Sequence, residues 1–226
     1  RLGLKGIPFL AEKIIVERDL SFLEEYFCRY HISQISSEKT ISVIKKAKKE
    51  GKIFTAGVSI NNLSLNENDI GDFKTFLKLS PPLRTENDRV ALVESINDGT
   101  LDVIVSDHKP QDEESKRLTF AQAATGATGV ETLLPLCLEL FHNKSVKLKK
   151  LIASITCNPA KILGISKGTL DKGNDADLCV FDINKAWVVD KNKLKSKSKN
   201  TPVENRKLQG QVLKTFVKGE LSYDSV

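Results

Sequence analysis

The chain has 226 residues, of which 40% are hydrophobic and 28% charged, and it carries a net charge of +6. This composition is ordinary for a globular protein with one sizeable core, alone or with a small appendage. No apolar run approaches the ~18 residues needed to cross a bilayer, so we expect no membrane partner. The cysteines lack the paired spacing of a zinc finger and are typical of a reducing, cytoplasmic location: Cys28, Cys137, Cys157 and Cys179.

The first three quarters of the chain alternate between short apolar runs and segments with helical spacing of apolar residues. The short runs predict buried strands over residues 30–35, 52–58, 76–79 and 101–108. The other segments predict helices over residues 8–26, 36–49, 85–97, 129–142, 148–157 and 158–164. Alternation of this kind predicts an α/β fold with a parallel sheet.

Beyond Gly168 the pattern of apolar residues changes from helical spacing to short alternating runs. Glycines and alternating runs predict short strands over residues 178–181, 187–189 and 212–217. We therefore expect two parts, an α/β part over residues 1–165 and a small β appendage over residues 166–226. A complete (β/α)8 barrel needs eight units and about 250 residues, so four units predict the second half of a barrel. The chain contains no methionine and begins with Arg1, and we expect it to be a fragment of a longer one.

A candidate site follows the last predicted strand of the sheet. Three β-branched residues, 103–105, are followed by Ser106, Asp107 and His108. In parallel α/β folds, chemistry gathers at the carboxyl ends of the strands. A carboxylate and an imidazole at this point are therefore candidate catalytic groups. The alternative is that both side chains only cap the helix that follows.

A basic run lies late in the chain, from Lys191 to Asn200. Lysines interleaved with serines can contact phosphates, but this run lacks aromatic residues and any nucleic-acid motif. We expect a solvated loop and no nucleic-acid partner. Nucleic-acid binding stays open as a minor alternative, which predicts an affinity that falls steeply with salt.

Several segments recur together in one known family: HISQIS, AGVSINNL, LSPPLRTENDR, GTLDVIVSDHKPQ and KGTLDKGNDADLCVFD. In this order and spacing the chain resembles the dihydroorotases of the amidohydrolase superfamily, over the family's C-terminal part. The resemblance implies the reversible cyclisation of carbamoyl aspartate to dihydroorotate in pyrimidine synthesis. In this chemistry a metal activates a water, and an aspartate at the end of the eighth strand acts as base.

The metal positions of the family are changed in this chain. The fifth strand of the family reads H-x-x-H-x-S, and here His31 is kept while the metal-binding position is Gln34. The sixth strand of the family ends Pro-His-His-Leu, and here Asn61 takes the ligand position. Amide oxygens replace imidazole poorly on a zinc-type ion. We read His31 itself as a hydrogen-bonded core histidine.

The family's Asp-His-Ala-Pro-His motif reads Asp-His-Lys-Pro-Gln here, which keeps Asp107 and His108 but replaces the last histidine by Gln111. Asp107 is then the candidate base. It either acts in catalysis or is an inherited residue without a present catalytic role. The family's substrate-binding Asn-Pro-Pro-Leu-Arg begins at Ser80 and ends at Arg84. By resemblance, Ser80, Asn61 and Arg84 are the expected substrate contacts.

Two functions follow from the resemblance. The first is a non-catalytic homologue that binds no metal by itself and partners aspartate transcarbamoylase, as one metal-site-deficient branch of the family does. The alternative is an active dihydroorotase with a reduced zinc site, completed by an N-terminal half that would carry the family's H-x-H pair. A half-barrel would also leave unpaired strand edges, so we expect a homo-oligomer or larger assembly.

Overall fold

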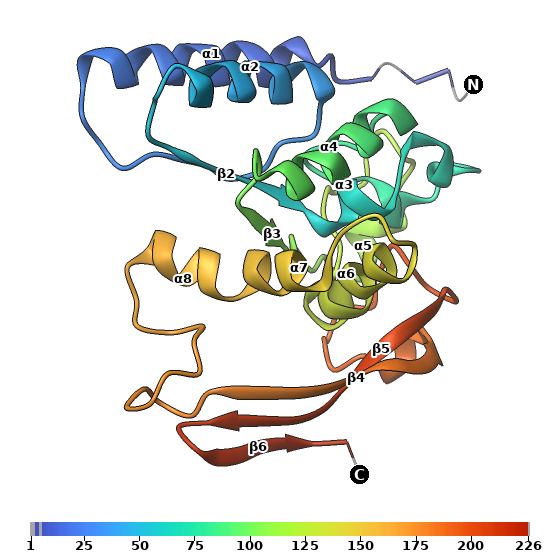
Figure 1. The fold of residues 1–226 in the computed structure, drawn as a ribbon. Coiled ribbons are helices and arrows are strands. Elements are labelled where there is room, and N and C mark those ends of the chain that lie inside the picture. Colours follow the sequence, from blue (N-terminus) through green and yellow to red (C-terminus); the bar gives the residue numbers. More distant parts are fainter. Residues whose placement is uncertain (1–2, 5, 226) are drawn as a thin grey trace.

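A three-stranded parallel sheet forms the centre of the computed structural model, which describes residues 3–4 and 6–225 (Figure 1). Its strands are β1 (His31–Ile32), β2 (Thr55–Ser59) and β3 (Val103–Val105), in the order β1-β2-β3. The register pairs His31 with Thr55 and Gly57 with Val103. The three carboxyl ends therefore lie at one edge of the sheet, as predicted.

Helices pack around this sheet. They are α1 (Leu10–Glu25), α2 (Glu38–Lys49), α3 (Ile60–Ser64), α4 (Glu86–Asp98), α5 (Glu113–Lys116), α6 (Leu133–His142), α7 (Leu148–Ile155) and α8 (Cys157–Leu163). Single 3-10 turns are η1 (Glu67–Ile70), η2 (Thr75–Leu77), η3 (Val130–Thr132) and η4 (Lys191–Lys193). Among the described residues, no helix is both long and apolar enough to cross a membrane.

Local sequence signals explain where several helices begin and end. The Ser37 side chain accepts a hydrogen bond from the Thr40 amide and caps α2, and Thr85 forms a reciprocal capping box with Asp88 at α4. Gly99 ends α4 in a left-handed conformation, φ 82°. The apolar faces of these helices meet the sheet in a core that includes Ile44, which is fully buried.

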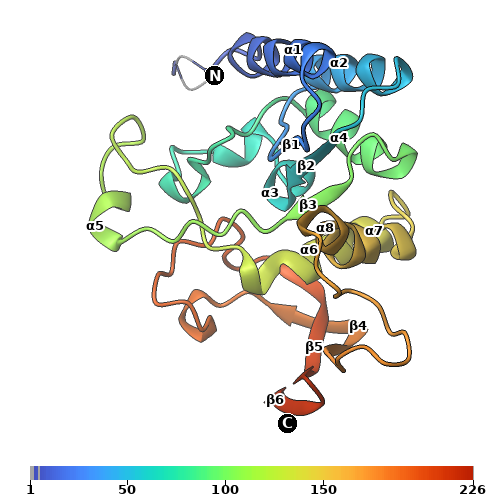
Figure 2. The same cartoon turned by 90° about the vertical axis from the view of Figure 1, so that its left-hand side faces the viewer.

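An antiparallel sheet forms the end of the molecule opposite α1 and α2 (Figures 1 and 2). It contains β4 (Leu178–Val188), β5 (Lys207–Val217) and β6 (Glu220–Asp224), in that order. The sheet packs closely on α6, because a Cβ added at Gly210 would lie 2.3 Å from Leu138 Cδ1. The β appendage thus agrees with expectation, although its first two predicted strands are one and β6 was not predicted. The boundary between residues 165 and 166 stays a prediction.

The predicted strand over residues 76–79 is wrong. The first two residues of the segment belong to the 3-10 turn η2, and carbonyl groups in and beside the segment accept hydrogen bonds from groups outside the sheet. Lys116 Nζ donates to Thr75 O at 3.0 Å, and Lys78 O accepts from the Gly126 amide at 2.9 Å. Three parallel strands are therefore present among the described residues, not four.

The basic run is not simply the solvated loop that we expected. Leu194 and Asn200 are buried, and the Asn200 side chain donates to Gly126 O at 3.0 Å. Ser198 Oγ donates to Gln111 O at 2.7 Å. The hydrogen bonds of Ser198 and Asn200 therefore join the basic run to the loop that follows β3.

Candidate functional site

Asp107 lies two residues beyond β3, at the carboxyl edge of the parallel sheet. Its side chain is 2% exposed and its φ is 48°, a left-handed conformation that non-glycine residues seldom adopt. The sequence left open that Asp107 caps the following helix, and the structure contradicts this. The cap of α5 is Asp112, whose side chain accepts from the Ser115 amide at 2.8 Å.

Two side chains hold the Asp107 carboxylate. Gln34 Nε2 donates to Oδ1 at 2.9 Å, and Lys109 Nζ lies 3.1 Å from the same oxygen. Lys109 Nζ also donates to Ser80 O at 3.1 Å. The structure therefore brings together Gln34, Ser80 and Asp107 from the predicted set.

Sequence reasoning missed Lys109. A signal was present, because Lys109 stands at the alanine of the Asp-His-Ala-Pro-His motif. An alanine at this position has no group that could reach the neighbouring aspartate. A lysine brings a positive charge with a long, flexible stem.

His108 is exposed, and its hydrogen bonds go to a different part of the chain from those of Asp107. Its Nδ1 accepts from the Gly129 amide at 3.1 Å and from the Val130 amide at 3.4 Å, at the start of η3. Nδ1 therefore carries no proton, and Nε2 is the donor of the ring. The capping alternative therefore fails for His108 as well, because its ring bonds to backbone amides at the start of η3 and the cap of α5 is Asp112.

Asn61 lies in α3 immediately after β2, and it is 1% exposed. Neither its Oδ1 nor its Nδ2 has a hydrogen-bond partner among the residues that the structure describes. A buried polar group without a partner costs about 1–3 kcal/mol. Such a group is usually explained by water or another molecule that the protein binds.

Arg84 is joined to the start of the fold. Its Nε donates to Ser36 Oγ at 2.7 Å, and its Nη1 donates to Ile7 O at 2.9 Å. Ser36 Oγ in turn donates to the Glu12 carboxylate. None of these contacts joins Arg84 to Asp107. The role of Arg84 in binding substrate stays a prediction.

His31 is hydrogen-bonded, as expected, but it is half-buried and does not belong to the buried core. Its Nδ1 lies 2.7 Å from Thr55 Oγ1 on the neighbouring strand. Burial lowers the pKa of the imidazole, against a smaller opposing effect of Asp102. The neutral ring is therefore favoured, and it packs under Gly57, where an added Cβ would lie 3.4 Å from Nε2.

Comparison with known proteins matches residues 8–222 to the amidohydrolase family. The chain belongs to this family. It is 43% identical to a dihydroorotase of Ehrlichia canis over its whole length and 51% of that relative, and 41% identical to one of Anaplasma phagocytophilum over 98% of the chain and 50% of the relative. The chain thus spans about half the length of the curated relatives that it matches.

Solved structures give the same picture of the fold. The L-hydantoinase (dihydropyrimidinase) of Arthrobacter aurescens superimposes with a TM-score of 0.91 and 29% identity, over 96% of this chain and 49% of that one. A D-hydantoinase of Thermus sp. superimposes with a TM-score of 0.88 at 21% identity, also over 49% of its length. This coverage is consistent with a partial amidohydrolase barrel.

The described residues at the carboxyl ends of β1, β2 and β3 do not by themselves form a zinc site. Zinc sites use three or four imidazole, thiolate or carboxylate ligands. The described part of the chain contains no group of three His, Cys, Asp or Glu side chains arranged to hold a metal. Gln34 and Asn61 offer only amides, and His108 already accepts two backbone amides through Nδ1.

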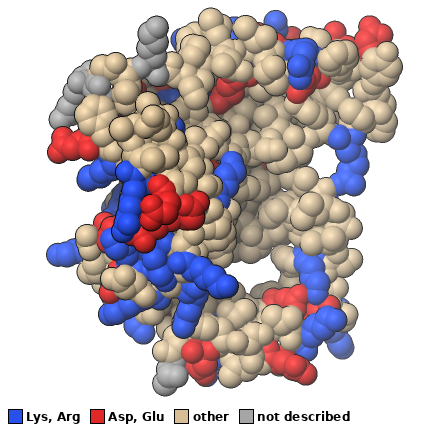
Figure 3. All heavy atoms as spheres, turned by 180° about the vertical axis from the view of Figure 1, so that it is seen from behind, with Lys and Arg blue, Asp and Glu red and all other residues tan. Residues whose placement is uncertain are grey.

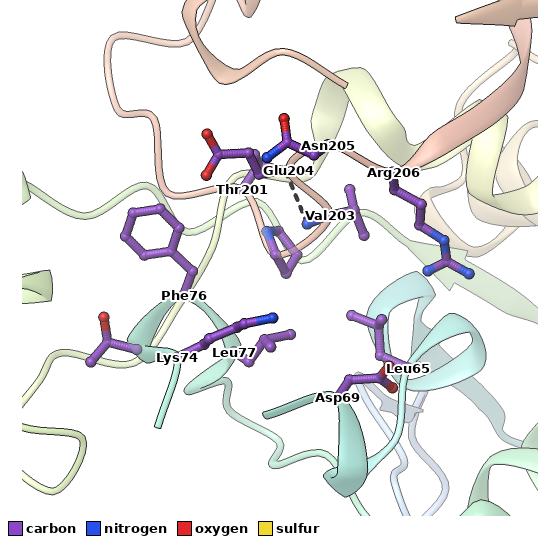
Figure 4. Close-up of a pocket in the computed structure, with 12 residues that line it drawn as sticks. Leu65, Asp69, Lys74, Phe76, Leu77, Thr201, Val203, Glu204, Asn205 and Arg206 are labelled. Atoms are coloured by element: carbon purple, nitrogen blue, oxygen red, sulfur yellow. Dashed lines mark hydrogen bonds between the residues drawn. The ribbon is translucent and has the colours of Figure 1, made fainter. Parts of the chain in front are cut away.

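A cavity of about 530 Å³ lies elsewhere, between the η1–η2 region and the segment 201–206 (Figure 4). Its walls carry charged side chains of both signs, and Arg206 donates to both oxygens of Glu139 at 2.8 and 2.9 Å. None of the candidate site residues lines this cavity. Figure 3 shows a hollowed middle on the face opposite Figure 1, with Lys and Arg side chains gathered along one side.

Proposed function

We propose that this amidohydrolase is a non-catalytic homologue of dihydroorotase. One observation carries the proposal: Gln34 and Asn61 occupy the positions where the family resemblance puts metal-binding histidines. Gln34 donates to Asp107 through Nε2, and its amide oxygen is a poor replacement for imidazole on a zinc-type ion. Relatives named dihydroorotase, at 41–43% identity, support the assignment to pyrimidine synthesis.

The proposed role is to assemble with aspartate transcarbamoylase, and with further copies of this chain. An exposed apolar surface supports an assembly role, since large patches of this kind mark interaction sites. It lies on α1 and just beyond it, and consists of Leu10, Ile14, Ile15, Phe22, Tyr26 and Phe27. Phe27 is 96% exposed. The cysteines are unpaired, which supports a reducing cytoplasm as the site of assembly.

The proposal is tested with the purified protein supplied with zinc and either dihydroorotate or carbamoyl aspartate. We expect no turnover in either direction, and co-sedimentation with aspartate transcarbamoylase from the same organism. Turnover at rates typical of enzymes, on the order of 1 to 1,000 per second, would overturn the non-catalytic role.

One feature favours the alternative, an active enzyme with a reduced metal site. Asp107 is retained, buried and held in a left-handed conformation, as a positioned base would be. If the alternative holds, Asp107→Asn abolishes a measurable activity. If the proposed function holds, the wild-type protein and the variant are equally inactive.

A further inference from the structure

We propose that the Lys109 ammonium is the resident cation of this site. It neutralises Asp107 from within the chain, and it keeps divalent metal away from that carboxylate. The inference rests on the proposed function in one respect, the assignment of the family's metal-binding positions to Gln34 and Asn61.

The burial of Asp107 creates the need for a cation. A buried carboxylate is costly unless a positive charge and hydrogen bonds compensate it. Lys109 Nζ supplies the charge at 3.1 Å from Oδ1, and Gln34 Nε2 supplies a hydrogen bond to the same oxygen at 2.9 Å. Both contacts come from donors, so this oxygen is not free to bind a metal.

The position of Lys109 is fixed by its surroundings. Its Nζ also donates to Ser80 O, and its backbone amide donates to Ala127 O at 2.8 Å. Gly126 lies so close that an added Cβ would be 2.7 Å from Lys109 O. These contacts fix the backbone of Lys109 and both the start and the end of its side chain, which is 48% exposed.

The geometry opposes metal binding in two ways. A divalent ion at Asp107 would have to displace the ammonium from Oδ1 or accept its repulsion at close range. It would also find amides at Gln34 and Asn61 instead of imidazoles. Restoring the histidines alone should therefore not restore tight binding while Lys109 remains.

The test uses a two-histidine variant, Gln34→His with Asn61→His, made with and without Lys109→Ala. Zinc affinity is measured by titration calorimetry on the full chain, after near-UV circular dichroism has shown that each variant is folded. We expect zinc to bind at least tenfold more tightly when Lys109→Ala is present. If the two-histidine variant does not fold, Gln34→His alone carries the same comparison.

Two controls isolate the role of the Lys109 charge. Lys109→Arg in the two-histidine variant keeps the charge and should leave zinc affinity within about twofold of the parent. Lys147→Ala removes an exposed lysine elsewhere and should do the same. Equal zinc affinity with and without Lys109, including no measurable binding in either, would overturn the inference. The proposed function fails by a different result, turnover by the wild-type protein.

Discussion

Asp107 and Lys109 form the closest charge pair at the candidate site, and their environments differ sharply. The aspartate side chain is 2% exposed, whereas the lysine is half-exposed. An unpaired carboxylate at the buried position would be destabilising, so removing Lys109 should cost more than removing an ordinary surface lysine.

A double-mutant cycle measures this pair directly. Lys109→Ala should lower the free energy of unfolding, and Asp107→Asn should make the same lysine change much less costly. We expect a coupling energy of about 1–2 kcal/mol from denaturant unfolding of the four proteins. Additive effects would show that the two side chains do not interact.

Lys116 is a buried lysine with backbone carbonyls, rather than a carboxylate, as its partners. Its Nζ donates to Ala124 O at 2.7 Å and to Thr75 O at 3.0 Å. Burial is the main cause that lowers the pKa of this lysine to about 8, and Lys78 adds to it. The unfolded chain, in contrast, keeps the ordinary lysine pKa near 10.4.

The stability of the protein should therefore depend on pH through Lys116. Between about pH 8 and pH 10.4 the unfolded state binds more protons at this residue, so its contribution to stability rises with pH, by about 3 kcal/mol in all. Lys116→Met should remove this rise from the measured free energy of unfolding. Lys147→Met, at an exposed lysine, should leave it intact. An unchanged pH profile in Lys116→Met would contradict the assignment.

Individual site residues differ in how far the sequence reveals them. Asp107 could be predicted because it lies two residues after a β-branched run, and the family motifs pointed to Gln34 and Asn61. Lys109 could not be predicted from periodicity. Its importance comes from its contact with the carboxylate of Asp107, and Asp107 has an unusual, left-handed backbone conformation. The partner of His108 lies 21 residues away at Gly129 and depends on the fold of the intervening loop.

Among the elements, α2 shows how one helix depends on another. Glu12 of α1 accepts hydrogen bonds from the Ser36 amide at 2.9 Å and the Ser37 amide at 3.1 Å, just before α2 begins. Ser36 Oγ also joins this carboxylate to Arg84. A negative charge at the N-terminus of a helix is favourable, and here it comes from a different helix.

Glu12→Ala should therefore destabilise the protein. We expect a loss of about 1–3 kcal/mol in the free energy of unfolding, because two backbone amides and a buried serine lose their acceptor. Glu17→Ala is the matched control on the same helix, since its carboxylate pairs with Lys13 at the surface. It should change stability by less than about 0.5 kcal/mol. Equal losses in both variants would contradict a specific role for Glu12.

The elements themselves were predictable where local signals and burial agree. The capped helices and the strands that became β2 and β3 lie where the pattern put them. The prediction for the segment 76–79 failed because Lys78 O accepts hydrogen bonds from Lys116 Nζ and from the Gly126 amide, two groups that are distant in the sequence. β6 was missed although Leu221 and Tyr223 alternate with polar residues, because the strand is short and exposed throughout and pairs with β5 at the edge of the sheet.

At the scale of the whole described structure, the proposed assembly role rests on the apolar residues that are exposed on α1. Charges introduced into that surface should prevent association. We expect the parent protein to sediment as an oligomer and Ile14→Lys with Phe22→Glu to sediment as a monomer. Glu17→Lys changes charge on the same helix outside the apolar surface and should leave the oligomer intact. A parent that is monomeric at all concentrations would contradict an assembly role.

The central claim is that this amidohydrolase keeps the architecture of a dihydroorotase site without its metal chemistry. The most direct test measures bound zinc and dihydroorotate turnover in one preparation of the wild-type protein, after dialysis against zinc. The account predicts no zinc retained at the carboxyl ends of the strands and no turnover above the uncatalysed rate. Stoichiometric zinc together with enzymatic turnover that Asp107→Asn abolishes would contradict it.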